Sequence, residues 1–191
     1  KVMSALYPLI MKASRLMGKR NVVQNTGQAP PPKPVYDLSV TLNNGTDLPL
    51  QNLQGKKVLV VNTASNCGYT AQYAELQQLQ KEHPNDLVVI GFPANDFKEQ
   101  EAGGDADIAQ FCQVNFGVTF PLAKKTSVVP GGEQHPLYKW LTQPEQNGWN
   151  KQAPSWNFSK YLLNENGVLT HYFDPAVSPL SNEVKNALQE K

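Results

Sequence analysis

The sequence is organised around residues 56–79, KKVLVVNTASNCGYTAQYAELQQL. This stretch begins with an apolar run, residues 58–61, that is typical of a buried strand, and it ends in the helical periodicity of residues 73–79. Cys67 lies between them, at the predicted N-terminus of the helix, where unpaired amide N–H groups and the helix dipole favour a thiolate. Its polar neighbours argue against the competing interpretation of a buried small hydrophobe. Cys67 is therefore the first candidate for chemistry.

A second apolar run, residues 87–92, predicts another buried strand after the helix. A strand, a helix and a strand in this order predict a right-handed crossover with two parallel strands. The polar loop of residues 93–97 then follows the second strand, at the same sheet edge as Cys67. In open α/β sheets, functional sites are built at the carboxyl ends of the strands.

The rest of the chain predicts further elements around this unit. An Asn43-Asn44-Gly45 turn indicates a hairpin of residues 36–42 and 46–50. The later segments are a helix opened by Asp105 as N-cap, an extended segment 117–122, a short helix 135–141, a loop 143–154, strands 160–163 and 168–173, and a terminal helix 183–190. The predicted fold is α/β and thioredoxin-like, with a mixed central sheet flanked by helices and an extra N-terminal β-hairpin.

Residues 1–34 are predicted to lie outside the domain, which spans 35–191. Residues 1–20 have the periodicity of an amphipathic helix, and residues 21–34 read as a linker that ends in a proline-rich run. Three roles of the helix stay open: docking on the domain, contact with a membrane surface through its basic side, or the remnant of a targeting segment. We expect a cytoplasmic protein, with a membrane-peripheral or exported form as the alternative.

Composition excludes several function classes. The 191 residues are 40% hydrophobic and 17% charged, with a formal net charge of +1, which suits a globular domain and not a nucleic-acid-binding one. The two cysteines form no disulfide framework and lack the spacing of a zinc site, so neither a metal nor another cofactor is expected. No apolar run reaches the roughly twenty residues of a membrane span.

Four stretches resemble the signature motifs of the glutathione peroxidase family, in the family's order. They are VNTASNCGYTAQYAELQQL, GFPANDFKEQEAG, FCQVNFGVTFPL and PSWNFSKYLL. The resemblance covers residues from about 35 to 189 and implies an enzyme that reduces hydrogen peroxide and organic hydroperoxides. It also implies that Cys67 attacks the peroxide and that the oxidised sulfur is regenerated by thioredoxin or glutathione, as part of the response to oxidative stress.

The resemblance also implies neighbours for the sulfur. Members of the family surround it with a Gln, a Trp and an Asn, and Trp156 and Asn157 match the last two. Such groups donate hydrogen bonds without adding a permanent charge. We place Asp96 at the glutamine position, where a carboxylate would raise the pKa of a nearby thiol. Asp96 is then either a proton relay or a plain loop residue, with Asn95 as a substitute donor.

Cys112 has two open interpretations. Thioredoxin-using members carry a resolving cysteine in the helix after the second motif, and the usual position corresponds to Gln113. Because one residue rotates a side chain by about 100° on a helix, Cys112 instead falls in phase with Ile108 and the core. It is either a resolving thiol or a structural residue.

Two other functions compete with a peroxidase. A thioredoxin-type disulfide exchanger would need a second cysteine three residues after Cys67, and Thr70 is there instead. A thioredoxin-like redox sensor or binding module, without efficient peroxide turnover, is the alternative from another class. The loop after Leu141 is short compared with tetrameric relatives, which predicts a monomer.

Overall fold

The computed structural model describes residues 21–27 and 29–190. Its centre is the parallel pair β4 (Lys57–Thr63) and β5 (Leu87–Pro93), joined by α2 (Gln72–Glu82). Every residue of β4 is buried. The predicted strand, helix and strand are therefore confirmed.

The main sheet has five strands in the order β1-β7-β6-β4-β5. The predicted C-terminal hairpin is present as β6 (Lys160–Leu163) and β7 (Leu169–Phe173), and β6 runs antiparallel to β4. On the other side of β5, the predicted extended segment makes a bridge between Leu122 and Gly91. A Cβ atom on Gly91 would lie 2.7 Å from Leu122 Cδ2, so any larger residue here would have to displace the Leu122 side chain.

The strand β1 (Val22–Gln24) corrects the prediction of a linker over residues 21–34. It pairs antiparallel with β7 at the edge of the sheet. Two β-branched valines in sequence suit an extended edge strand, and their side chains point to opposite sheet faces: Val22 packs on one core cluster and Val23 on the other. The domain boundary at residue 35 stays a prediction, and the helix predicted for residues 1–20 lies outside the described residues.

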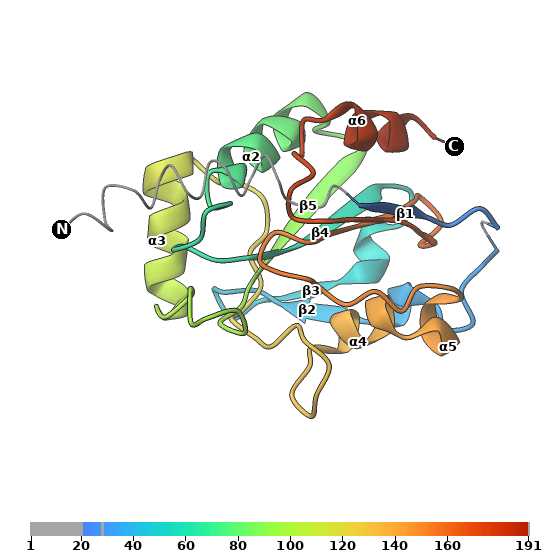
Figure 1. Cartoon of the computed structure of the whole chain (residues 1–191), viewed down its shortest axis with the longest axis horizontal. Helices are drawn as coiled ribbons and strands as arrows, with labels where there is room; N and C mark the ends of the chain where they lie inside the picture. Colours follow the sequence, from blue (N-terminus) through green and yellow to red (C-terminus); the bar gives the residue numbers. More distant parts are fainter. Residues whose placement is uncertain (1–20, 28, 191) are drawn as a thin grey trace.

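Two hydrophobic clusters cover the two faces of the sheet, because neighbouring residues of a strand point to opposite faces. Val58 and Val60 of β4 belong to one cluster, whereas Leu59 and Val61 belong to the other. The first face is covered by α4 (Pro136–Thr142), α5 (Pro144–Asn147), the hairpin of β2 (Ser39–Thr41) and β3 (Asp47–Pro49), and the short 3-10 helices η1 (Val35–Asp37) and η2 (Leu50–Leu53). The second face is covered by α2, α3 (Asp105–Phe116) and α6 (Asn182–Gln189), and Figure 1 shows α2 and α6 across the sheet from α4 and α5.

Three local predictions differ from the structure. The first hairpin strand begins at Ser39, because residues 35–37 form η1. Gly104 holds the N-cap position of α3, and the Asp105 carboxylate accepts the Lys125 N–H at 2.7 Å instead. The predicted loop 143–154 contains α5, which begins at a proline, a residue well suited to a first helical turn.

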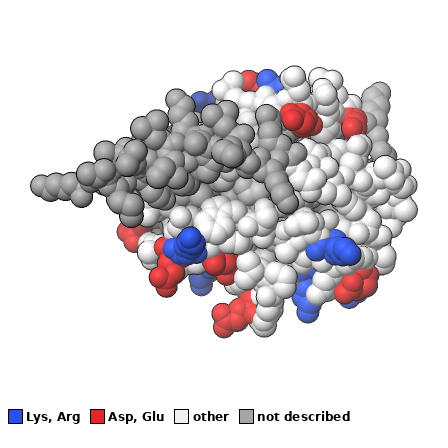
Figure 2. Space-filling view, viewed as in Figure 1, with Lys and Arg blue, Asp and Glu red and all other residues white. Residues whose placement is uncertain are grey.

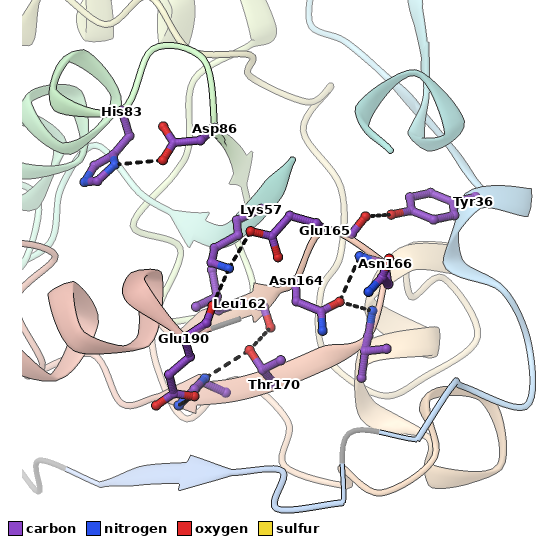
Figure 3. A network of polar contacts seen from close by, with 12 residues as sticks. Tyr36, Lys57, His83, Asp86, Leu162, Asn164, Glu165, Asn166, Thr170 and Glu190 are labelled. Carbon is purple, nitrogen blue, oxygen red and sulfur yellow. Dashed lines mark hydrogen bonds and ion pairs between the residues drawn. The ribbon is translucent and has the colours of Figure 1, made fainter. Parts of the chain in front are cut away.

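A buried lysine joins the chain's C-terminal end to the start of β4. Lys57 pairs with the Glu165 carboxylate at 2.7 Å and donates to the Glu190 carbonyl at 2.8 Å (Figure 3). This network lies at the amino end of β4, so it braces the sheet at the end opposite to Cys67. On the face seen in Figure 2, the basic and acidic side chains that are coloured lie interspersed.

Candidate active site

Cys67 lies in a turn between β4 and α2. The chain passes through consecutive tight turns before the helix begins at Gln72, so the prediction of a helix N-terminus at Cys67 is wrong by five residues. The Cys67 carbonyl accepts the Thr70 N–H at 3.1 Å, and the sulfur accepts the Tyr69 N–H at 3.4 Å. The amide that faces the sulfur is therefore that of a local turn. The side chain is half-buried.

Thr70 holds this turn in place. Its hydroxyl accepts the Cys67 N–H at 2.9 Å and donates to the Ala64 carbonyl at 2.9 Å. A cysteine could not make both bonds at these distances, because a thiol is a weak donor and a weak acceptor. The residue that argues against dithiol exchange thus also fixes the loop that carries Cys67.

The end of β4 also binds the segment that carries Trp156 and Asn157. The Asn62 side chain donates to the Trp156 carbonyl at 3.0 Å, and the Asn62 carbonyl accepts the Phe158 N–H at 2.6 Å. Asn157 is fully buried, and the half-buried Trp156 ring lies 5.3 Å from the Phe97 ring. These contacts bring the two predicted residues to the edge of the sheet from which the Cys67 loop departs.

Gln100 joins the two segments. Its side-chain oxygen accepts the Asn157 Nδ2–H at 2.8 Å, and its backbone carbonyl accepts the Asn66 N–H at 3.1 Å. The chain reaches this position through Lys98 and Glu99, which both have left-handed backbone angles (φ 50° and 53°). Gln100 therefore links the segment of Asn157 to the residue that precedes Cys67.

The Asp96 carboxylate is bonded away from Asn157 and the Cys67 loop. Its two carboxylate oxygens accept the Ser127 hydroxyl at 2.9 Å and the Val128 N–H at 2.8 Å. Burial raises the pKa of Tyr138, and the charge of the nearby Asp96 adds to this rise. Tyr138 belongs to the core cluster on the opposite sheet face from the one on which Cys67 packs. Asn95 makes a hydrogen bond within the loop that follows β5: its side-chain oxygen accepts the Glu101 N–H at 2.9 Å. The motif GFPANDFKEQEAG does contain a glutamine, Gln100, four residues after Asp96.

Cys112 lies on the inner face of α3 and is fully buried. It belongs to the same cluster as Ile108 and Tyr73. The pKa of its thiol is raised to about 11: burial is the main cause, a hydrogen bond with Tyr73 lowers it, and the charge of the nearby Glu101 raises it. In this conformation Cys112 is a neutral core residue.

Comparison with known proteins decides the family. The family model described as glutathione peroxidase matches residues 35–142. The glutathione peroxidase-like peroxiredoxin HYR1 of Saccharomyces cerevisiae is 40% identical over 158 residues, which cover 81% of this chain and 96% of the yeast protein. The chain belongs to the glutathione peroxidase family. The glutathione peroxidase homolog BsaA of Bacillus subtilis is also similar, with 37% identity over 82% of this chain and 99% of its own.

Solved structures agree with this membership. A structure titled "Crystal structure of Trgpx in apo form" is 32% identical, with a TM-score of 0.62 over 83% of this chain and 97% of the other. A thioredoxin family protein from Chlorobium tepidum, 16% identical with a TM-score of 0.57 over 84% of this chain and 97% of its own, shares the fold. The predicted thioredoxin-like α/β fold is thus confirmed.

As a glutathione peroxidase family member, the protein is a thiol peroxidase, an oxidoreductase that reduces peroxides with electrons from thiols. Within residues 21–27 and 29–190, no helix has the length and apolar character needed to cross a membrane. In the same part of the chain, no group of three His, Cys, Asp or Glu side chains is placed to hold a metal ion.

Proposed function

We propose that Cys67 is the peroxidatic residue and that a dithiol protein of the thioredoxin type regenerates it. The observation that carries the proposal is the environment of the half-buried Cys67 sulfur. Thr70 holds its turn by hydrogen bonds, and Gln100 links this turn to the segment of Trp156 and Asn157. A thiol in such a place is both reachable and held in one geometry, which nucleophilic catalysis requires.

The first step consumes the peroxide. The Cys67 thiolate attacks one oxygen of the O–O bond, so that an S–O bond forms while the O–O bond breaks. The bonding electron pair leaves with the second oxygen, which takes up a proton and departs as water or as an alcohol. The sulfur is oxidised to a sulfenic acid.

Three neutral side chains support this step in the proposal. Asn157 gives one amide N–H to Gln100, which leaves its second N–H for the sulfur side. Gln100 accepts that bond with its oxygen, so its own amide N–H groups stay available for an anion. Trp156 contributes an indole N–H, which can only donate. Donors without a formal charge stabilise a thiolate without fixing it as strongly as a salt bridge would.

The second step returns the sulfur to the thiol. A thiol of the reductant attacks the sulfenic acid, releases water and forms a mixed disulfide with Cys67. A second thiol of the same reductant then displaces Cys67 and leaves the reductant as a disulfide. An external dithiol is favoured over Cys112, because Cys112 is fully buried and holds its proton tightly.

The charges beside the site are mixed. Glutathione carries two carboxylates, and such groups are usually bound by Arg or Lys. Lys98, whose ammonium nitrogen lies 5.9 Å from the centroid of the Trp156 ring, would attract them, but Glu99 and Asp107, which border a cavity next to the Cys67 loop, would repel them. We further propose a monomer, which keeps this edge open to a protein reductant and which light scattering measures directly.

Peroxide consumption coupled to thioredoxin with its reductase, or to glutathione with its reductase, tests the function. We expect turnover with thioredoxin, a loss of at least about 10³-fold in Cys67→Ser, and rates within about twofold of the parent in Cys112→Ser. Activity that survives in Cys67→Ser would overturn the assignment of the nucleophile. Faster turnover with glutathione would overturn the proposed reductant, and one stoichiometric oxidation without turnover would indicate a sensor.

A further inference from the structure

A cavity of about 330 Å³ adjoins the Cys67 loop. Ser65 and Asn66 form one side of it, and the loop of residues 99–103 forms another. Ile108 and Phe111 of α3 also line it. We call it the α3 cavity. A volume of this size lies at the lower end of those that hold small organic ligands.

The α3 cavity is directly connected to the proposed catalytic residues. Asn66, in its wall, is the residue before Cys67, and its N–H is bonded to the Gln100 carbonyl at 3.1 Å. Gln100 lines the cavity too, while its side chain holds Asn157. A ligand in the α3 cavity would therefore lie beside the loop that presents the sulfur.

The cavity contains a buried carboxyl group with free hydrogen-bonding capacity. Glu101 is only 1% exposed, and its Oε2 has no hydrogen-bond partner among the described residues. Burial raises the pKa of Glu101, and Ser65 and Lys125 oppose that shift only in part. The group is thereby shifted toward a neutral carboxylic acid, which can donate a hydrogen bond as well as accept one.

The rim of the cavity bears negative charge. Glu99 and Asp107 both line it and are both exposed. The Lys125 ammonium group donates to the Gly103 carbonyl at 2.6 Å, on the same loop, and its positive charge opposes the rise that burial causes in the pKa of Glu101. Carboxylates at the entrance disfavour an anionic ligand, whereas the walls made by Ile108 and Phe111 favour an apolar one.

We propose that the α3 cavity holds the organic group of a neutral hydroperoxide while the peroxide reaches Cys67, and that it discriminates against hydroperoxides that carry a carboxylate. This inference rests on the proposed function of Cys67. It adds a location for the organic group and a charge selectivity that follows from Glu99 and Asp107.

A pair of tryptophan variants tests the location. Ala102 is an exposed residue of the cavity wall, so Ala102→Trp fills the cavity, whereas Ala106→Trp puts the same side chain on an exposed position of α3 outside it. With thioredoxin as reductant, Ala102→Trp should lower kcat/KM for cumene hydroperoxide about tenfold and leave that for hydrogen peroxide within about twofold. Ala106→Trp should leave both values within about twofold of the parent.

A charge variant tests the selectivity. The parent should use cumene hydroperoxide better than its para-carboxylate derivative, and Glu99→Gln should raise kcat/KM for the derivative about two- to threefold without changing that for the neutral compound. Equal use of both compounds by the parent would contradict the selectivity. Equal losses for hydrogen peroxide and cumene hydroperoxide in Ala102→Trp, or no loss for either, would contradict the location.

Binding gives a readout that does not depend on turnover. In Cys67→Ser protein, the product alcohol 2-phenyl-2-propanol should shift the NMR signals of residues 101–111, and Ala102→Trp should abolish these shifts. Shifts confined to other regions would overturn the inference. Failure of the proposed function is distinguishable, because it would appear as activity that survives in Cys67→Ser.

Discussion

The two cysteines of this chain occupy opposite kinds of environment. Cys67 is half-buried in a turn at the edge of the core cluster, with the Tyr69 N–H directed at its sulfur. Cys112 is fully buried on a helix, within a cluster of apolar and aromatic side chains. A thiol that must meet a peroxide needs exposure and hydrogen-bond donors, whereas burial in apolar surroundings keeps a thiol protonated and inert. The comparison teaches that position in the fold, and not the number of thiols, assigns their roles.

The largest effect we expect in this comparison comes from removing the polar support of Cys67. Gln100→Ala deletes the acceptor of the buried Asn157 amide and should lower kcat/KM for hydrogen peroxide about 100-fold. Steady-state kinetics measure it. Asp96→Ala is the matched control from the same loop: it should cost about 1–3 kcal/mol of stability through two lost hydrogen bonds and leave the kinetics nearly unchanged. The reverse pattern would restore Asp96 to the active site.

A smaller effect should appear in the pH dependence of stability. The folded pKa of Cys112 is about 11, above its ordinary value of 9.0, so the folded state holds this proton more tightly than the unfolded state. The contribution of this group to the free energy of unfolding is fully present below pH 9 and is lost as the pH rises through 11. The difference of about two pKa units corresponds to at most about 2.7 kcal/mol. Burial also raises the pKa values of the buried tyrosines above 10, so they too destabilise the folded state as the pH rises. Urea unfolding at pH 8 and pH 10.5 should therefore compare the parent with Cys112→Ser, and the parent should lose more stability. A parallel loss of stability in both proteins would contradict the assigned environment.

The smallest effect concerns packing at neutral pH. Cys112→Ala leaves a small cavity between α3 and the sheet and should cost about 1 kcal/mol of unfolding free energy. Cys67→Ala, in a half-exposed turn, should change the unfolding free energy by less than about 0.5 kcal/mol. Thermal and urea denaturation measure both. Equal costs at the two positions would show that the two sites are packed alike.

The elements that could be predicted from the sequence are those whose pattern is local. The apolar runs of β4 and β5 and the turn between β6 and β7 needed no knowledge of the rest of the chain. Likewise, the phase that Cys112 shares with Ile108 indicated the inner face of a helix. The strand β1 could not be predicted, because three residues carry too little periodicity and its partner β7 is almost 150 residues away in sequence.

The candidate site shows the same limit. Trp156 and Asn157 were found through their motif, and the structure brings them to the loop of Cys67 through Asn62. Gln100 lies in the same motif as Asp96, but its approach to Asn157 depends on the left-handed backbone at Lys98 and Glu99. That conformation is uncommon for residues other than glycine, and nothing in the local pattern predicts it.

The most direct test of the roles of the two thiols is mass spectrometry of the native protein after one equivalent of hydrogen peroxide, with a sulfenic acid trap present and no reductant. We predict the trapped sulfenic acid on Cys67 and an unmodified thiol on Cys112. Unfolding the sample before alkylation should then label Cys112 completely. A disulfide between Cys67 and Cys112 under these conditions would contradict the account, because it would require Cys112 to leave the core and act as the resolving thiol.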